Sequence, residues 1–233
     1  NKKIYNLVRN INLNEFSDFL LNQSNFELEA KNILSFNKIF KNYDIIHIPK
    51  VIDYSNDYLV MSKEKGFKIE EFRRKYPEYL DETVSLIFSS VYFMIKNKIV
   101  HGDLHFGNFL FNLNDDKKRV EITILDFGVT CQLTDKQSKY LTTFLKTKNK
   151  NKLILFLKEI MINIPESLEI DENSKDTNII KKILNNDNII LPSNFISLFS
   201  TLKIVFELQA ECQKLNPDFN KYILGYMIEN DFY

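Results

Sequence analysis

Two short segments of the 233-residue chain concentrate the residues that could do chemistry. Segment 101–108 reads His-Gly-Asp-Leu-His-Phe-Gly-Asn and segment 125–128 reads Leu-Asp-Phe-Gly, so that together they hold two of the three histidines and three of the five glycines. Phosphoryl transfer needs a carboxylate that orients the attacking hydroxyl, and oxygen ligands that hold Mg²⁺ on the phosphates. We therefore predict a site for ATP and Mg²⁺ in which Asp103 is the catalytic carboxylate and Asn108 and Asp126 bind the metal.

The order and setting of the two segments make this hypothesis specific. Asp103 and Asn108 have the Asp-x-x-x-x-Asn spacing of a kinase catalytic loop, and Asp126 opens an Asp-Phe-Gly directly after an apolar strand. One alternative is structural, with Asp103 and Asn108 capping a turn while Asp126 ends a strand. Another takes His101, Asp103 and His105 as zinc ligands, for which His47 is the one remaining histidine.

The elements that must position these segments follow from caps and apolar periodicity. Asn25 is a candidate cap for a helix that runs to about Phe40, and Asp81 for a helix that ends near Asn97. The remaining predicted helices cover 69–76, 135–146, 150–161, 178–184, 193–214 and 218–228, while the predicted strands cover 45–52, 58–61, 109–113 and 120–125. The pattern predicts an α+β chain with a small sheet-bearing lobe followed by a mainly helical lobe.

Composition excludes some classes of function and partner. Hydrophobic residues make up 44% and charged residues 27% of the chain, a balance typical of globular proteins. Lysine plus arginine equals aspartate plus glutamate at 31 each, so charge gives no reason to expect nucleic acid as a partner. The two cysteines belong to no metal-binding spacing and indicate a reducing, intracellular compartment. The longest apolar run, 84–95, is too short to span a bilayer.

The glycine before Asp103 makes segment 101–108 similar to two groups of phosphotransferases. One comprises the aminoglycoside and choline phosphotransferases, and the other is the UbiB family of atypical kinases, also called AarF or ADCK. Three further segments favour UbiB: 26–32 resembles the family's Glu-Ala-x-Asn helix, 132–135 its Leu-Thr segment, and 215–220 (Leu-Asn-Pro-Asp-Phe-Asn) its Leu-Asp-Pro-Asp-Phe-Asn. This resemblance extends in order over roughly residues 20–230.

The resemblance implies a protein-kinase-like fold and further roles. Residues 1–65 would form part of the N-lobe, with a helix, two strands and the hinge, and residues 66–233 the helical C-lobe. Glu29 would pair with the nucleotide-binding lysine, Met61 would lie before the adenine pocket, and the hinge Ser62–Glu64 would meet adenine. The implied activity is that of an ATPase or phosphotransferase in a family linked to coenzyme Q and lipid metabolism. The lysine run 146–152 resembles a solvated helix junction, with contact to acidic lipid or a membrane surface as the alternative.

The chain also departs from the family pattern. Gln23-Ser24-Asn25 stands where the family has Glu-x-Asp, Phe106 replaces a proline, and no Gly-rich loop, Val-Ala-x-Lys strand or Lys-x-Gly-Gln segment precedes Glu29. Lys2 and Lys3 have no strand around them. We therefore expect an N-terminally truncated sequence or a pseudokinase. By itself the chain should bind Mg-ATP weakly at best, transfer no phosphate and tend to associate through uncovered sheet and helix surfaces.

Overall fold

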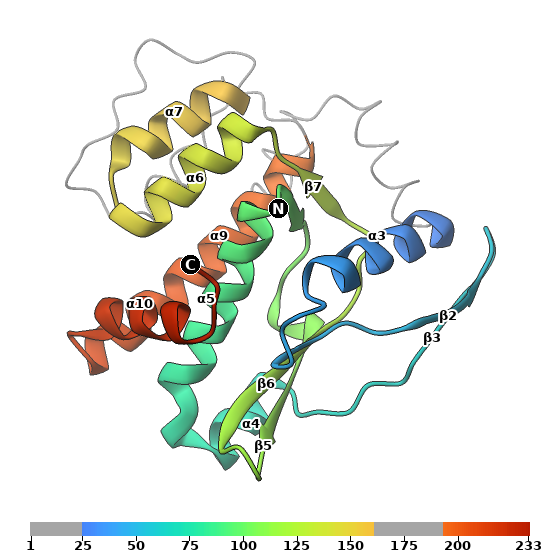
Figure 1. Ribbon diagram of the computed structural model, residues 1–233, viewed down its shortest axis with the longest axis horizontal. Coiled ribbons are helices and arrows are strands. Elements are labelled where there is room, and N and C mark those ends of the chain that lie inside the picture. Colours follow the sequence, from blue (N-terminus) through green and yellow to red (C-terminus); the bar gives the residue numbers. More distant parts are fainter. Residues whose placement is uncertain (1–24, 161–192) are drawn as a thin grey trace, which may run out of the picture.

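The computed structural model describes residues 25–160 and 193–233 (Figure 1). The described elements are, in chain order, α3 (Phe26–Ile39), β1 (Ile46–His47), β2 (Val51–Tyr54), β3 (Leu59–Met61), α4 (Ile69–Lys75), η1 (Pro77–Tyr79), α5 (Leu80–Lys96), β4 (Ile99–His101), η2 (Phe106–Asn108), β5 (Phe109–Asn114), β6 (Arg119–Ile124), β7 (Thr130–Gln132), α6 (Asp135–Thr147), α7 (Lys150–Ile160), α9 (Ser193–Leu215) and α10 (Phe219–Glu229). The predicted helix 178–184, Lys2, Lys3, Gln23 and Ser24 lie outside these residues.

The other sequence-predicted helices are confirmed to within one residue at each end. Asn25 caps α3 as expected, because its Oδ1 accepts a hydrogen bond from the backbone N–H of Leu28 at 2.9 Å. The cap predicted at Asp81 is wrong. A 3₁₀ turn leads into α5 without a side-chain cap, and the carboxylate of Asp81 accepts instead from the amide of Asn216 at 2.9 Å.

The strands form three small sheets. β5 and β6 form an antiparallel hairpin, with β1 added in parallel on the other side of β6, while β2 pairs with β3 and β4 with β7. The β-rich segment 45–52 was predicted with a break at Pro49, and it forms β1 before this proline and β2 after it, since proline lacks a backbone N–H donor. Because β1 pairs with β6, the two predicted lobes share a sheet, and the boundary at residue 65 stays a prediction.

Helix α5 is the centre of the helical layer. It is buried on nearly every side, as expected for a helix that is apolar all round, and contacts α6, α9 and α10 (Figure 1). Ser89 and Ser90 are tolerated inside it because their hydroxyls donate to the carbonyls of Ser85 and Ile87 at 2.7 Å each. Within the described ranges, none of the helices has the length and apolar character needed to cross a membrane.

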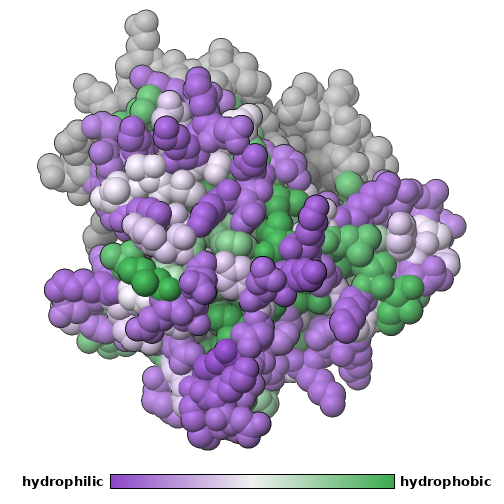
Figure 2. Space-filling model, in the orientation of Figure 1, coloured by the Kyte–Doolittle hydropathy of each residue, from purple (hydrophilic) through white to green (hydrophobic). Residues whose placement is uncertain are grey.

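Apolar side chains remain exposed on the β2–β3 hairpin and on α3. Ile52 and Val60 are 67% and 44% exposed, and Leu34 is 50% exposed. Figure 2 shows hydrophobic surface at the right-hand side of the molecule, where Figure 1 places the hairpin. These residues belong to the surfaces through which we expect the chain to associate, and that expectation stays a prediction.

Candidate active site

The pairing of β4 with β7 brings the two chemical segments together. His101 ends β4 opposite Thr130 of β7, so the catalytic loop leaves one strand beside the Asp-Phe-Gly segment that leads into the other. The backbone N–H of Gly102 donates to the carbonyl of Val129, and that of Leu125 donates to the carbonyl of Asn108, each at 2.9 Å. Both ends of the catalytic loop are thereby joined to the strand and loop that carry Asp126.

Asn108 is buried at the end of η2 and holds the catalytic loop closed. Its Nδ2 donates to the backbone carbonyl of Asp103 at 2.8 Å. This bond uses the donor side of the amide, so Oδ1 is the atom left to act as a metal ligand. The carboxylate of Asp103 is half-exposed and accessible to a substrate.

A left-handed backbone conformation at Asp126 separates its side chain from that of Phe127. Asp126 has φ 60° and is exposed, whereas Phe127 is fully buried against Phe36 and His101, with ring centroids at 4.8 and 5.2 Å. A non-glycine residue in this conformation costs about 1–2 kcal/mol. The buried ring of Phe127 offsets this cost and fixes the carboxylate of Asp126 at the surface.

Helix α3 holds the Asp-Phe-Gly segment through two side chains. Glu29 Oε1 accepts from the backbone N–H of Phe127 at 3.3 Å, and Asn32 Nδ2 donates to the carbonyl of the same residue at 2.8 Å. Asn32 Oδ1 also accepts from the hydroxyl of Thr130 at 3.4 Å. No role for Asn32 was predicted from the sequence, although its position one turn after Glu29 places both side chains on one face of the helix.

Negative charge collects where Glu29 approaches Asp126. Burial raises the pKa of Glu29, the charge of Asp126 raises it further, and the bond from the Phe127 N–H opposes both. The half-buried carboxylate of Glu29 and the exposed carboxylate of Asp126 repel one another unless a cation lies nearby. The arrangement therefore suits a cation, which the sequence analysis expected to be a lysine at Glu29 and Mg²⁺ at Asp126.

His101 is buried beneath the catalytic loop, and both of its ring nitrogens are engaged, so it is not available to bind zinc. It is fully buried, its Nε2 lies 3.0 Å from the carbonyl of Leu125, and its Nδ1 accepts from the backbone N–H of Asp103 at 3.1 Å. Burial lowers the pKa of His101, which favours the neutral ring. Both ring nitrogens are occupied, and no group of three His, Cys, Asp or Glu in residues 25–160 and 193–233 is placed to hold a metal. The zinc alternative is thus not supported.

His105 faces the carboxylate of Asp103. Its Nδ1 accepts from the backbone N–H of Gly107 at 3.0 Å, so in the neutral ring the proton is on Nε2, which lies 3.7 Å from Oδ2 of Asp103. A Cβ at position 107 would lie 2.7 Å from the His105 ring, which explains the glycine there. From the sequence, His105 was expected only as a candidate zinc ligand. Its place beside Asp103 depends on this loop geometry.

The predicted hinge directly follows β3. The hydroxyl of Ser62 accepts from the backbone N–H of Lys50 at 2.8 Å and donates to Glu64 at 2.5 Å, and Met61 packs half-buried against the core. Beyond the hinge, Lys68 Nζ donates to the carbonyl of Gly107 at 2.6 Å. The structure thus links the segment after the hinge to the catalytic loop, while the adenine-contacting roles of Met61, Ser62 and Glu64 stay predictions.

Gly66 allows the hinge to pass close to β5. Its φ is 153°, and an added Cβ would meet Cβ of Leu110 at 2.8 Å and the backbone N of Phe111 at 3.2 Å. We expect Gly66→Ala to lower the free energy of unfolding by about 2 kcal/mol or more, from backbone strain and the clash together. Gly225→Ala is the control, since open space surrounds that position in α10 and alanine there should stabilise by roughly 0.5–1 kcal/mol. Urea unfolding measures both, and equal stabilities would contradict the assignment.

The donor set fits Mg²⁺ held together with a nucleotide. Mg²⁺ in phosphotransfer sites is bound by one or two carboxylates plus substrate phosphates, not by a protein cage. Asp126 and Oδ1 of Asn108 provide two hard oxygen ligands in adjoining segments. When bound, the ion would supply positive charge that offsets the charge of the phosphates.

Comparison with known proteins agrees with this arrangement. Residues 3–155 match the ABC1 atypical kinase-like domain, which is more than half of the chain. The chain belongs to this family. Among proteins similar to this ABC1 domain, the probable serine/threonine-protein kinase abkC of Dictyostelium discoideum is 35% identical over 106 residues, covering 44% of the chain. The probable protein kinase UbiB of Vibrio cholerae is 24% identical over 146 residues, covering 59%. The UbiB resemblance is therefore confirmed.

The chain spans only 15% of abkC and 26% of UbiB, so the comparison applies to an ABC1 domain and not to those whole proteins. A solved structure, the Rv3197–erythromycin complex from Mycobacterium tuberculosis, is similar to it with a TM-score of 0.53 and 18% sequence identity. That similarity covers 89% of this chain and 61% of the other. At this identity it concerns the fold alone, and it confirms the predicted α+β, kinase-like class.

Proposed function

We propose that this ABC1 domain binds ATP with Mg²⁺ and forms the catalytic core of an ATPase or phosphotransferase. The observation that carries the proposal is the joining of the catalytic loop to the Asp-Phe-Gly segment. Asn108 bonds both to Asp103 and to the residue before Asp126, so the three candidate residues are held in one place. Catalysis of phosphoryl transfer depends mostly on such positioning and on charge stabilisation.

Each residue has a distinct task in this proposal. Asp103 orients the attacking hydroxyl or accepts its proton. The Nε2–H group of His105 lies near Asp103, where it stabilises either the Asp103 carboxylate or the negative charge that develops on the phosphate. Asn108 and Asp126 would hold Mg²⁺, whose charge would offset that of the phosphates. Glu29 and Asn32 keep the Asp-Phe-Gly segment turned so that Asp126 faces outward.

The metabolic role of the protein is proposed from its relatives, and its cellular location from its two cysteines. The resemblance to the UbiB family supports a role in coenzyme Q or lipid metabolism. Cys131 and Cys212 are buried and free, and burial raises the pKa of each to about 12, so neither thiol is reactive. Unpaired thiols support an intracellular location.

The direct test is nucleotide-dependent stabilisation of the 233-residue chain. Millimolar ADP with Mg²⁺ should raise the melting temperature by a small but measurable amount, because a ligand that binds only the folded state stabilises it and the chain by itself is expected to bind nucleotide weakly. ADP with EDTA and Mg²⁺ alone should each raise it much less. Identical melting temperatures in all three conditions would contradict the proposal.

A further inference from the structure

A threonine of α9 bonds to the catalytic loop on both sides of Asp103. The hydroxyl of Thr201 donates to the backbone carbonyl of His101 at 3.4 Å and accepts from the backbone N–H of Leu104 at 3.3 Å. All three residues are buried, and Thr201 itself is 1% exposed. A buried backbone N–H needs an acceptor, and a hydroxyl can donate and accept at once. Thr201 gives the N–H of Leu104 its acceptor and ties it to the residue that opens the loop.

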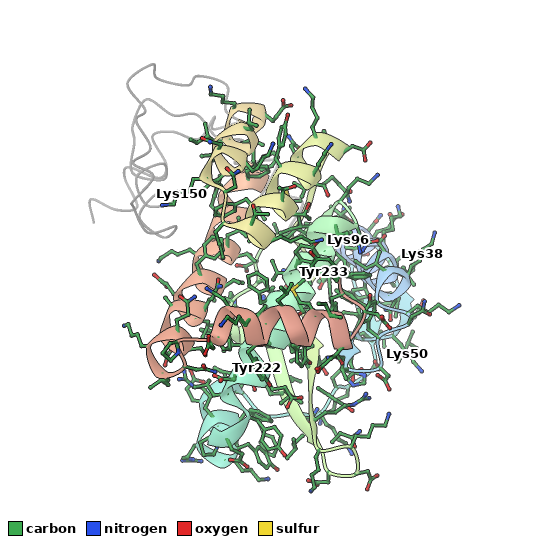
Figure 3. The ribbon with its side chains drawn as sticks, turned by 60° about the vertical axis from the view of Figure 1, so that its left-hand side comes forward. Lys38, Lys50, Lys96, Lys150, Tyr222 and Tyr233 are labelled. Atoms are coloured by element: carbon green, nitrogen blue, oxygen red, sulfur yellow. The ribbon has the colours of Figure 1, made fainter. Side chains whose placement is uncertain are left out.

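Helix α9 places this hydroxyl against the loop from the helical side of the molecule. The helix contacts β4, which leads into the catalytic loop, and β7, which follows the Asp-Phe-Gly segment, and it also packs on α5. Figure 1 shows α9 passing β7, and Figure 3 shows α10, which carries Tyr222, turning away from its far end. Near that end Arg73 of α4 donates to Glu211 of α9 at 2.6 Å. Thr201 therefore lies on a helix that is held at several points.

The other threonines in the described helices use their hydroxyls differently. Thr83, Thr142, Thr143 and Thr147 each donate to the carbonyl four residues earlier, at 2.7 or 2.8 Å. Such a bond is the common arrangement for a threonine inside a helix. The bonds of Thr201 go to loop residues 97 and 100 positions earlier in the chain. Threonine is not a favoured residue in helix interiors, and an unbonded buried hydroxyl is costly, so the contact with the loop explains the residue found here.

Asp103 lies between the two loop groups that Thr201 holds. The backbone N–H of Asp103 donates to Nδ1 of His101 at 3.1 Å, and its carbonyl accepts from Nδ2 of Asn108 at 2.8 Å. With His101 and Leu104 both bonded to α9, the backbone is fixed on each side of Asp103 while the carboxylate stays half-exposed. The hydroxyl of Thr201 thus acts on the direction of this side chain through the neighbouring backbone.

We propose that Thr201 is a positioning residue, through which α9 fixes the direction in which the catalytic loop presents the carboxylate of Asp103. This inference rests on the proposed function, in which that carboxylate orients the attacking hydroxyl. Phosphoryl transfer depends mostly on positioning, and a misplacement of about 1 Å can cost on the order of a hundredfold in rate. A shift of α9 relative to β4 would therefore change catalysis without contact with the nucleotide.

The first test is amide hydrogen exchange, followed by NMR, in the 233-residue chain with Thr201→Val. Valine removes the hydroxyl at nearly constant size, so the amide of Leu104 loses its acceptor and should exchange roughly tenfold faster or more. The amides of the β5–β6 hairpin should exchange as before. Thr83→Val is the matched control, because that hydroxyl is equally buried and bonds to Tyr79 in place of the loop. Thr201→Ser keeps the hydroxyl and should keep the protection of Leu104.

The second test is kinetic and uses any version of the protein that turns over ATP. Thr201→Val should lower kcat about tenfold or more while KM for ATP stays within about twofold, because the hydroxyl positions Asp103 and does not bind the nucleotide. Thr201→Ser should recover most of kcat, and Thr83→Val should leave it within about twofold of the original value. Thr201→Ala removes the same hydroxyl without bulk and replaces the valine variant in both tests if that variant does not fold.

Three results would overturn the proposal. One is unchanged exchange at Leu104 when the hydroxyl is removed, and another is a uniform rise in exchange over the whole molecule, which would indicate a role in overall stability only. The third is an unchanged kcat in Thr201→Val while Asp103→Asn is inactive. Full activity of Asp103→Asn would contradict the proposed function itself, so the two failures are distinguishable.

Discussion

Replacing Asp126 by asparagine should remove the Mg²⁺-dependent part of ADP binding while leaving the chain folded. Asparagine keeps an oxygen at the same place but loses the charge that attracts the ion, and two protein ligands leave little to compensate for that loss. Binding should weaken at least tenfold, which corresponds to about 1.4 kcal/mol. Thermal shift with Mg²⁺–ADP and with ADP plus EDTA measures the effect, and the two melting temperatures should become the same in the variant.

The choice of asparagine separates metal binding from backbone strain. Asp126 has φ 60°, a conformation that asparagine tolerates better than alanine does. Removing its charge also relieves Glu29, whose pKa the Asp126 charge raises, so the unliganded stability should change by less than about 0.5 kcal/mol. Asp126→Ala should likewise lose the ADP response, with a lower melting temperature from strain. Asp115→Asn, in the exposed β5–β6 turn, is the matched control. An unchanged ADP shift in Asp126→Asn would refute the metal assignment.

Local patterns were enough to predict the parts of the site that depend on sequence spacing. Asp103, Asn108 and Asp126 lie in two short motifs, and loop spacing and the preceding strand are visible in the chain itself. Helix α3 could be predicted equally well from the sequence, since Asn25 caps it and its apolar residues recur at helical spacing. Predicting these features does not require knowing which distant segments of the chain contact one another.

The features that were missed depend on contacts between distant segments. β4 and β7 have three residues each, too few for a periodic signal, and they form a sheet only because each supplies the other's hydrogen bonds. Asn32 and Phe127 are joined by a hydrogen bond although 95 residues separate them, so the role of Asn32 required the fold. His105 faces Asp103 because of a bond to Gly107 that the residue spacing alone does not specify.

Replacing Asp103 by asparagine should separate nucleotide binding from catalysis. The structural bonds at this residue use its backbone, since its N–H donates to His101 and its carbonyl accepts from Asn108. The half-exposed carboxylate makes none of these loop-holding hydrogen bonds. The Asp103→Asn variant should therefore fold and bind Mg²⁺–ADP like the original chain. In any version of the protein that turns over ATP, the turnover should fall on the order of a hundredfold or more, the scale expected for one positioned acid–base group.

The distinction between kcat and KM makes this prediction decisive. Asp103 acts on the attacking hydroxyl and not on the bound nucleotide, so the loss should appear in kcat while KM for ATP stays within about twofold. Asp135→Asn is the matched control, because that carboxylate at the start of α6 is 92% exposed and pairs only with Lys98 among the contacts the structure describes. A rise in KM without a fall in kcat would mean that Asp103 holds the nucleotide. Full activity would show that the catalytic carboxylate lies elsewhere.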